Sequence, residues 1–263
     1  MFFSIFQAIL LAIIVMLFLS VVIHRSKYMA DYIVHLIRFE HFVHYREGTL
    51  SPVSEARLRI VKRKILVLDM DETLIYAKRY RPSRCGDMSG FPYVPWDFSF
   101  TIESHTGTFY VYKRPHLDYF LQKVSEWFYI CVYTASTEIY ANAILDYLES
   151  EQRYFCTRLY RGNCIDVLGV RGKFVGVVSM DLQNVILVDN SAMECGLNPN
   201  NSIRIKDFVG DPYDFELQNL LPFLDCLRFT HDVRTILKMN TNFPNVLNVL
   251  LQLSNPFRNV QRN

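Results

Sequence analysis

The stretch Ile65-Leu66-Val67-Leu68, followed by Asp69 and Asp71, restricts the fold of this chain more than any other. Four apolar residues without alternation predict a strand covered on both faces, as in parallel sheets. Two carboxylates about 5 Å apart, in an effective dielectric of about 20, repel each other by roughly 3 kcal/mol. We therefore expect a cation or a shared proton at the end of this strand. A simple turn is the alternative interpretation for a lone aspartate.

Further apolar runs alternate with amphipathic ones along the chain, which predicts an α/β fold with a parallel sheet and helices on both faces. Two more runs separated by a turn, 97–103 and 107–112, predict a short β-hairpin flap in place of a large cap domain. The expected strands are 65–68, 128–133, 154–159 and 185–188, and the expected helices are 115–127 and 137–149.

Polar side chains follow three of these strands, at the edge of a parallel sheet where ligands bind. They are Asp69 and Asp71 after the first strand, Thr134 after the second, and the pair Asp189 and Asn190 after the last. Their oxygen atoms are ligands of the kind that Mg²⁺ prefers. The sequence therefore predicts a magnesium site at this edge.

Lys173 lies at the end of a glycine-rich loop, 169–173. Taken alone it would be an ordinary surface lysine. Next to a hydroxyl donor, a metal ion and a nucleophilic carboxylate, it is predicted to bind a phosphoryl group.

The amino-terminal segment 2–23 contains no charged side chain, and 16 of its residues are Leu, Ile, Phe or Val. Its length and composition predict a single transmembrane helix, and a secretory signal peptide is the alternative. Arg25, Lys27 and Arg38 follow the segment, and no Lys or Arg precedes it. By the positive-inside rule the rest of the chain is expected on the cytoplasmic side.

We therefore divide the chain into a membrane anchor (1–24), an amphipathic and basic juxtamembrane linker (25–60), a catalytic domain (61–240) and a tail (241–263). Within the linker, 28–45 has apolar residues at helical spacing. Such a helix lies on the bilayer surface, docks on a membrane partner, or serves only as a linker.

Charge and cysteine content exclude several classes of protein. The net charge is only +2, from 28 basic and 26 acidic residues, and no basic run with interspersed aromatic residues indicates a nucleic-acid partner. The six cysteines contain no C-x-x-C pair, so neither a zinc site nor a disulfide scaffold is indicated. A reducing compartment is consistent with this pattern.

The motif Asp69-Met70-Asp71-Glu72-Thr73 resembles that of the haloacid dehalogenase superfamily of phosphotransferases, in particular its carboxyl-terminal-domain (FCP/SCP-like) phosphatase branch. Residues 50–54 and 61–69, with the apolar segment before them, are similar to the Dullard group of nuclear envelope phosphatases in that branch. The resemblance covers about residues 50–239. Further similar stretches are 113–116, 133–136, 138–140, 189–191 and 219–224.

This resemblance implies a role for each residue of the predicted cluster. Asp69 would attack the phosphoryl group, and Asp71 would protonate the leaving oxygen and then activate water. Mg²⁺ would be held by Asp69, the backbone carbonyl of Asp71 and Asn190, with Asp189 in support. Thr73 would support the loop that carries both aspartates.

Thr134 and Lys173 would hold the phosphoryl oxygens in line. The chain departs from the pattern of the branch at three nearby positions. Phe174 stands where Asp is usual, and Ala192 and Cys195 stand where Pro and Tyr are expected. These departures put the rate and the choice of substrate in doubt more than the type of reaction.

The expected function is therefore a membrane-anchored, Mg²⁺-dependent protein serine/threonine phosphatase of the nuclear envelope and endoplasmic reticulum, with its catalytic domain on the cytoplasmic or nucleoplasmic side. The resemblance further implies lipin-type phosphatidate phosphatases as substrates and a small membrane regulatory subunit as partner. One alternative is a membrane-tethered scaffold like the Tim50 subunit of mitochondrial import, although the Arg-rich transit segment is missing. A small-molecule phosphatase is the other.

Overall fold

The computed structural model describes residues 15–23, 25–26, 50–80, 95–103, 106–167 and 170–238. The chain divides into two compact units, residues 1–44 and 45–263. In the first unit residues 15–23 are helical. Much of the predicted anchor, all of the 28–45 segment and the 241–263 tail fall outside the described residues. Among the residues that are described, no helix is both long and apolar enough to cross a membrane.

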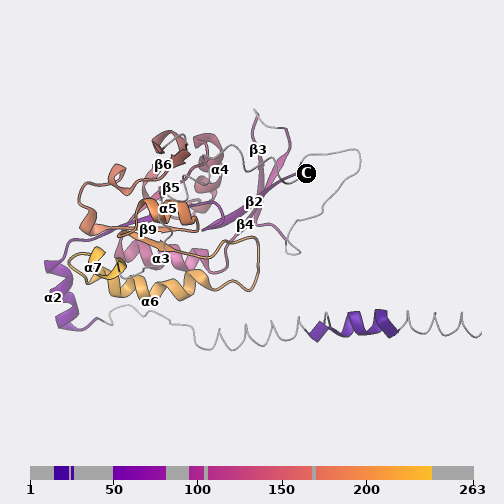
Figure 1. The fold of residues 1–263 in the computed structure, drawn as a ribbon, viewed down its shortest axis with the longest axis horizontal. Helices are drawn as coiled ribbons and strands as arrows, with labels where there is room; N and C mark the ends of the chain where they lie inside the picture. Colours follow the sequence, from indigo (N-terminus) through magenta and orange to yellow (C-terminus); the bar gives the residue numbers. More distant parts are fainter. Residues whose placement is uncertain are drawn as a thin grey trace, which may run out of the picture. The chain divides into compact units, whose positions relative to one another are not determined.

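A parallel sheet forms the centre of the second unit (Figure 1). Its described part has five strands in the order β10-β9-β1-β5-β6, and every neighbouring pair is parallel. The central position of β1 explains its unbroken apolar sequence, because both of its edges are paired and both of its faces are covered. The predicted α/β fold is confirmed. The strands are β1 (Ile65–Leu68), β5 (Tyr129–Tyr133), β6 (Phe155–Leu159), β9 (Val185–Asp189) and β10 (Ser202–Arg204).

The two faces of the sheet are covered in different ways. Leu66 and Leu68 belong to the larger apolar cluster, with the helices α3, α4 and α6. Val67 points to the opposite face, where it packs in a smaller cluster with Val175 and Leu182 from short 3-10 helices. Figure 1 shows α3 and α6 side by side along the sheet. The α-helices are α2 (Pro52–Ile60), α3 (Leu117–Trp127), α4 (Glu138–Leu148), α5 (Ala192–Leu197), α6 (Glu216–Arg228) and α7 (Arg234–Leu237), and the 3-10 helices are η1 (Arg161–Asn163), η2 (Val175–Val177) and η3 (Leu182–Asn184).

The predicted hairpin is present, and the flap contains one strand more than we expected. Within the described part of the chain it is a three-stranded antiparallel sheet, β2 (Ile75–Tyr80), β4 (Thr108–Lys113) and β3 (Phe98–Thr101), in that spatial order. It projects to one side of the parallel sheet in Figure 1. Sequence reasoning missed β2 because all but its first residue are half-buried, which leaves no clear apolar pattern.

Two smaller predictions also need correction. The loop expected at 169–173 contains a strand, β8 (Val170–Gly172), that pairs with β7 (Ile165–Val167). Helix α3 begins at Leu117 rather than at Pro115, because His116 adopts a left-handed backbone conformation with φ of 65°. A residue in that conformation cannot continue a right-handed helix.

Arg114, directly after β4, connects the flap to the loop that carries the two aspartates. Its side chain is fully buried and forms a bidentate ion pair with Asp214, with N–O distances of 2.7 and 2.8 Å. A further guanidinium N–H donates to the backbone oxygen of Thr73 at 2.9 Å, and another to that of Lys206 at 2.8 Å. The rigid fork of an arginine makes such multiple contacts possible.

We predict that Arg114→Met lowers the free energy of unfolding by about 3–5 kcal/mol, because it leaves the Asp214 carboxylate buried without its partner. Urea denaturation of the full chain measures this loss. Arg114→Met combined with Asp214→Leu should recover part of it, whereas Arg234→Met, at a partly exposed ion pair with Asp232, should change little. A single Arg114 variant no less stable than the double variant would contradict the prediction.

Candidate active site

Asp69 directly follows β1, and the backbone around it holds its side chain at the carboxyl edge of the sheet. Its N–H donates to the carbonyl of Val188 in β9, at 3.0 Å. The carboxylate is buried and receives two side-chain hydrogen bonds, from the Thr73 hydroxyl to Oδ2 at 3.0 Å and from the Lys173 ammonium to Oδ1 at 2.6 Å. Asp69 is therefore held in one orientation.

Asp71 lies on the same loop in a different environment. Its Oδ2 accepts a hydrogen bond from the Ser136 hydroxyl at 2.7 Å, and its Oδ1 accepts one from the Tyr140 hydroxyl at 2.8 Å. Burial and the nearby charge of Asp69 raise the pKa of Asp71, although the two hydroxyls and Lys173 oppose this. The two carboxylates are thus held by different partners, as groups with different chemical roles would be.

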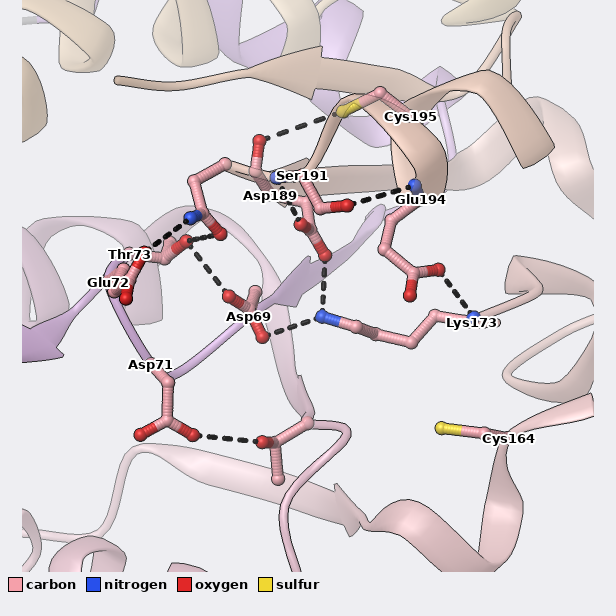
Figure 2. Close-up of polar contacts among 12 residues, drawn as sticks. Asp69, Asp71, Glu72, Thr73, Cys164, Lys173, Asp189, Ser191, Glu194 and Cys195 are labelled. Carbon is pink, nitrogen blue, oxygen red and sulfur yellow. Dashed lines mark hydrogen bonds and ion pairs between the residues drawn. The ribbon is translucent and has the colours of Figure 1, made fainter. Parts of the chain in front are cut away.

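Lys173 follows β8 and is almost fully buried. Figure 2 shows its ammonium group between the carboxylates of Asp69 and Asp189. The N–O distance is 2.6 Å to each. Burial alone would lower the pKa of Lys173, but these two carboxylates outweigh it and raise the pKa. This ammonium lies at the end of the first strand, but it pairs with Asp69 and Asp189 rather than with Asp69 and Asp71. Its two contacts use two of the three N–H donors of a lysine.

Thr134 and Asn190 complete the predicted cluster. Thr134 follows β5 and is buried, with its hydroxyl oxygen 3.4 Å from Asp71 Oδ2. Asn190 follows β9, and its Oδ1 lies 3.3 Å from the Thr73 hydroxyl. All seven predicted site residues therefore lie at the carboxyl edge of β1, β5 and β9 or on the neighbouring end of β8.

Asp69 Oδ2 and Asn190 Oδ1 are two side-chain oxygens of the site that could hold a metal ion. The Thr73 hydroxyl lies within hydrogen-bonding distance of both Asp69 Oδ2 and Asn190 Oδ1, so these two oxygens face the same point. In the described part of the chain no group of three or more His, Cys, Asp or Glu side chains could hold a metal. A metal ion held by so few protein groups would take its remaining ligands from water and from a substrate phosphate.

Sequence reasoning assigned no role to three side chains that support the site. Ser136 and Tyr140 hold Asp71, and both stand in stretches that resemble the phosphatase branch. Buried Glu194 accepts a hydrogen bond from the backbone N–H of Lys173 at 2.5 Å (Figure 2). Burial raises the pKa of Glu194. An isolated glutamate in a short helix gave no signal of this contact.

The three departures from the pattern of the branch lie beside the site without replacing any of its groups. Phe174 is partly exposed, and Ala192 begins α5. The Cys195 thiol is buried, and it donates to the backbone oxygen of Asp189 at 3.6 Å (Figure 2). Burial raises the pKa of Cys195 to about 12, so this thiol stays protonated and unreactive at neutral pH.

The family model for NLI interacting factor-like phosphatases matches residues 64–234. CTD nuclear envelope phosphatase 1 from Xenopus tropicalis is 44% identical over 200 residues, which are 75% of this chain and 81% of that protein. Nuclear envelope morphology protein 1 from Saccharomyces cerevisiae is 34% identical over 71% of this chain and 44% of its own length. The structure of Fcp1, an essential RNA polymerase II CTD phosphatase, aligns with 72% of this chain and 55% of its own, at 21% identity and a TM-score of 0.45.

We predict that Lys173→Met destabilises the protein by about 3–5 kcal/mol, because the carboxylates of Asp69 and Asp189 are then left buried without a counter-charge. Thermal and urea unfolding measure the change. Lys123→Met is the matched control: this lysine is also largely buried, but its partner Glu126 is exposed enough to be hydrated, so a smaller loss is expected. Equal losses for the two variants would show that the location of Lys173 between two carboxylates adds nothing to its contribution to stability.

Proposed function

Because this chain belongs to the family of NLI interacting factor-like phosphatases, we propose that it is a magnesium-dependent protein serine/threonine phosphatase that forms an aspartyl phosphate on Asp69. One observation carries the mechanism. Asp69 is fixed by Lys173 and Thr73, whereas Asp71, on the same loop, is held by hydroxyl groups. The first carboxylate suits a nucleophile, and the second suits a group that gives and takes protons.

In the first step an Asp69 oxygen bonds to phosphorus, and the bond between phosphorus and the serine oxygen breaks. Asp71, protonated at the start, gives its proton to that serine oxygen as it leaves. The raised pKa of Asp71 favours this protonated form. Lys173 keeps Asp69 oriented during the attack, and its remaining N–H is available to a phosphoryl oxygen.

In the second step Asp71, now ionised, takes a proton from a water molecule that attacks phosphorus. The bond between Asp69 and phosphorus breaks, inorganic phosphate leaves, and both aspartates return to their starting states. The buried Thr134 hydroxyl stands beside Asp71 and would hold a phosphoryl oxygen in line with the attack.

Asp69, the backbone carbonyl of Asp71 and Asn190 would hold Mg²⁺, with Asp189 in support. When bound, the ion would draw negative charge from the phosphoryl oxygens. The three-stranded flap takes the place of a large cap domain, so we propose that the site admits a phosphorylated protein segment. Lipin-type phosphatidate phosphatases are the proposed substrates.

We predict that Asp69→Asn lowers phosphate release from phosphoserine peptides by more than about a thousandfold, because an amide is a far weaker nucleophile than a carboxylate. The assay uses the full chain with and without Mg²⁺, and chelation of the metal should stop the wild-type reaction. Asp118→Asn, at an exposed carboxylate paired with Lys113, is the control and should stay active.

Full activity of Asp69→Asn would refute the aspartyl-phosphate mechanism. Faster turnover of sugar phosphates than of phosphopeptides would favour a small-molecule phosphatase. In cells, lipin should carry more phosphate when Asp69→Asn replaces the wild-type chain, and an unchanged level would remove lipin from the proposed substrates.

We also propose that segment 2–23 anchors the protein in the membrane of the nuclear envelope and endoplasmic reticulum, beside a small membrane regulatory subunit. The names of the relatives and the apolar composition of that segment support this location. A tagged full chain should label the nuclear envelope by microscopy, and deletion of 2–23 should release it. Purification of the tagged chain should recover a small membrane protein. Mitochondrial inner-membrane labelling would favour the scaffold function instead.

A further inference from the structure

Two hydroxyl groups near the start of α4 hold the carboxylate of Asp71. Ser136, in the loop before the helix, donates to Oδ2 at 2.7 Å. Tyr140, in its first turn, donates to Oδ1 at 2.8 Å. The torsion that turns a carboxylate about its last bond has broad, shallow minima, so such contacts decide where each oxygen points. The orientation of the Asp71 carboxylate is therefore set by Ser136 and Tyr140, which lie outside the loop that carries Asp71.

The ring of Tyr140 also packs against the flap. It meets the ring of Phe109 in β4 edge to face, with centroids 5.2 Å apart, and lies 5.8 Å from the ring of Phe100 in β3. Phe100 and Phe109 are partners across the two strands, and their rings stack at 5.2 Å. Aromatic pairs at these distances are attractive beyond the area that they bury. Tyr140 thus contacts both the flap and Asp71.

We propose that Tyr140 is a positioning residue for proton transfer: its hydroxyl orients the Asp71 carboxyl toward the leaving serine oxygen, and the flap rings of Phe100 and Phe109 hold Tyr140 in place. This inference rests on the proposed function. It adds a route by which the flap influences the chemical step, since a shift of these rings moves the hydroxyl that orients the acid.

The leaving group separates this role from a general structural one. A serine oxygen must receive a proton as the bond to phosphorus breaks, whereas nitrophenolate leaves readily without one. A poorly oriented Asp71 should therefore slow the hydrolysis of a phosphoserine peptide and leave the hydrolysis rate of para-nitrophenyl phosphate almost unchanged. General acid catalysis contributes roughly 10²–10⁴-fold, so losing one of the contacts that orient the acid should remove about tenfold of this.

The test compares Tyr140→Phe with the wild-type full chain on both substrates. We expect kcat for the phosphoserine peptide to fall by about tenfold with little change in KM, and kcat for para-nitrophenyl phosphate to change less than about twofold. Phe109→Leu, which keeps the hydroxyl but loosens its support, should produce the same selective loss at a smaller size.

Tyr147→Phe is the matched control. This tyrosine lies two turns further along α4 and also stacks on the flap, with its ring 3.8 Å from that of Phe98, but the hydroxyl of Tyr140 is the one that meets Asp71. Both substrates should react with Tyr147→Phe at the wild-type rate.

Equal losses on the two substrates, a change confined to KM, or no loss would each overturn the role of Tyr140 while leaving the phosphatase function in place. Different results would show that the proposed function itself is wrong. In that case the wild-type chain does not release phosphate from the peptide, or Asp69→Asn retains the activity.

Discussion

The two ion pairs of Lys173 are the interaction on which the site depends. Asp69 ends β1 and Asp189 ends β9, and the parallel register of these neighbouring strands brings the two carboxylates to one edge. Both carboxylates are buried, so without a counter-charge their desolvation and mutual repulsion would destabilise the fold. The ammonium of Lys173, 2.6 Å from each, offsets this repulsion and fixes the Asp69 carboxylate. The electrostatic balance of this edge therefore depends on one lysine charge.

A second set of contacts ties the flap to this edge. Arg114, after β4, donates a hydrogen bond to the backbone oxygen of Thr73 and forms an ion pair with the buried carboxylate of Asp214. Tyr140 joins the flap rings to Asp71. The flap is therefore connected to the loop of the two aspartates at the backbone of Thr73 and, through Tyr140 of α4, at the Asp71 carboxylate. A cover connected in this way can take part in positioning as well as in limiting access to the site.

Local sequence was sufficient for much of the fold and for the composition of the site. Unbroken apolar runs identified β1, β5 and β9, because strands buried on both faces need apolar residues at every position. The prediction failed for β2, whose burial is partial, and for the β7–β8 hairpin, whose strands have three residues each. A short, half-buried strand has no distinctive pattern, and only its pairing partner makes it a strand.

The sequence by itself determined that Asp69, Asp71, Thr134, Asp189 and Asn190 gather at the edge of the sheet, because these residues stand at the ends of apolar runs that predict buried strands. Only the tertiary structure decided how those groups pair. No spacing along the chain places Lys173 between Asp69 and Asp189, or Tyr140 against Asp71. These contacts join segments that are distant in sequence, and their geometry depends on strand order, register and the packing of the flap. The sequence thus determined which functional groups are present at the site, and the tertiary structure determined which group each carboxylate contacts.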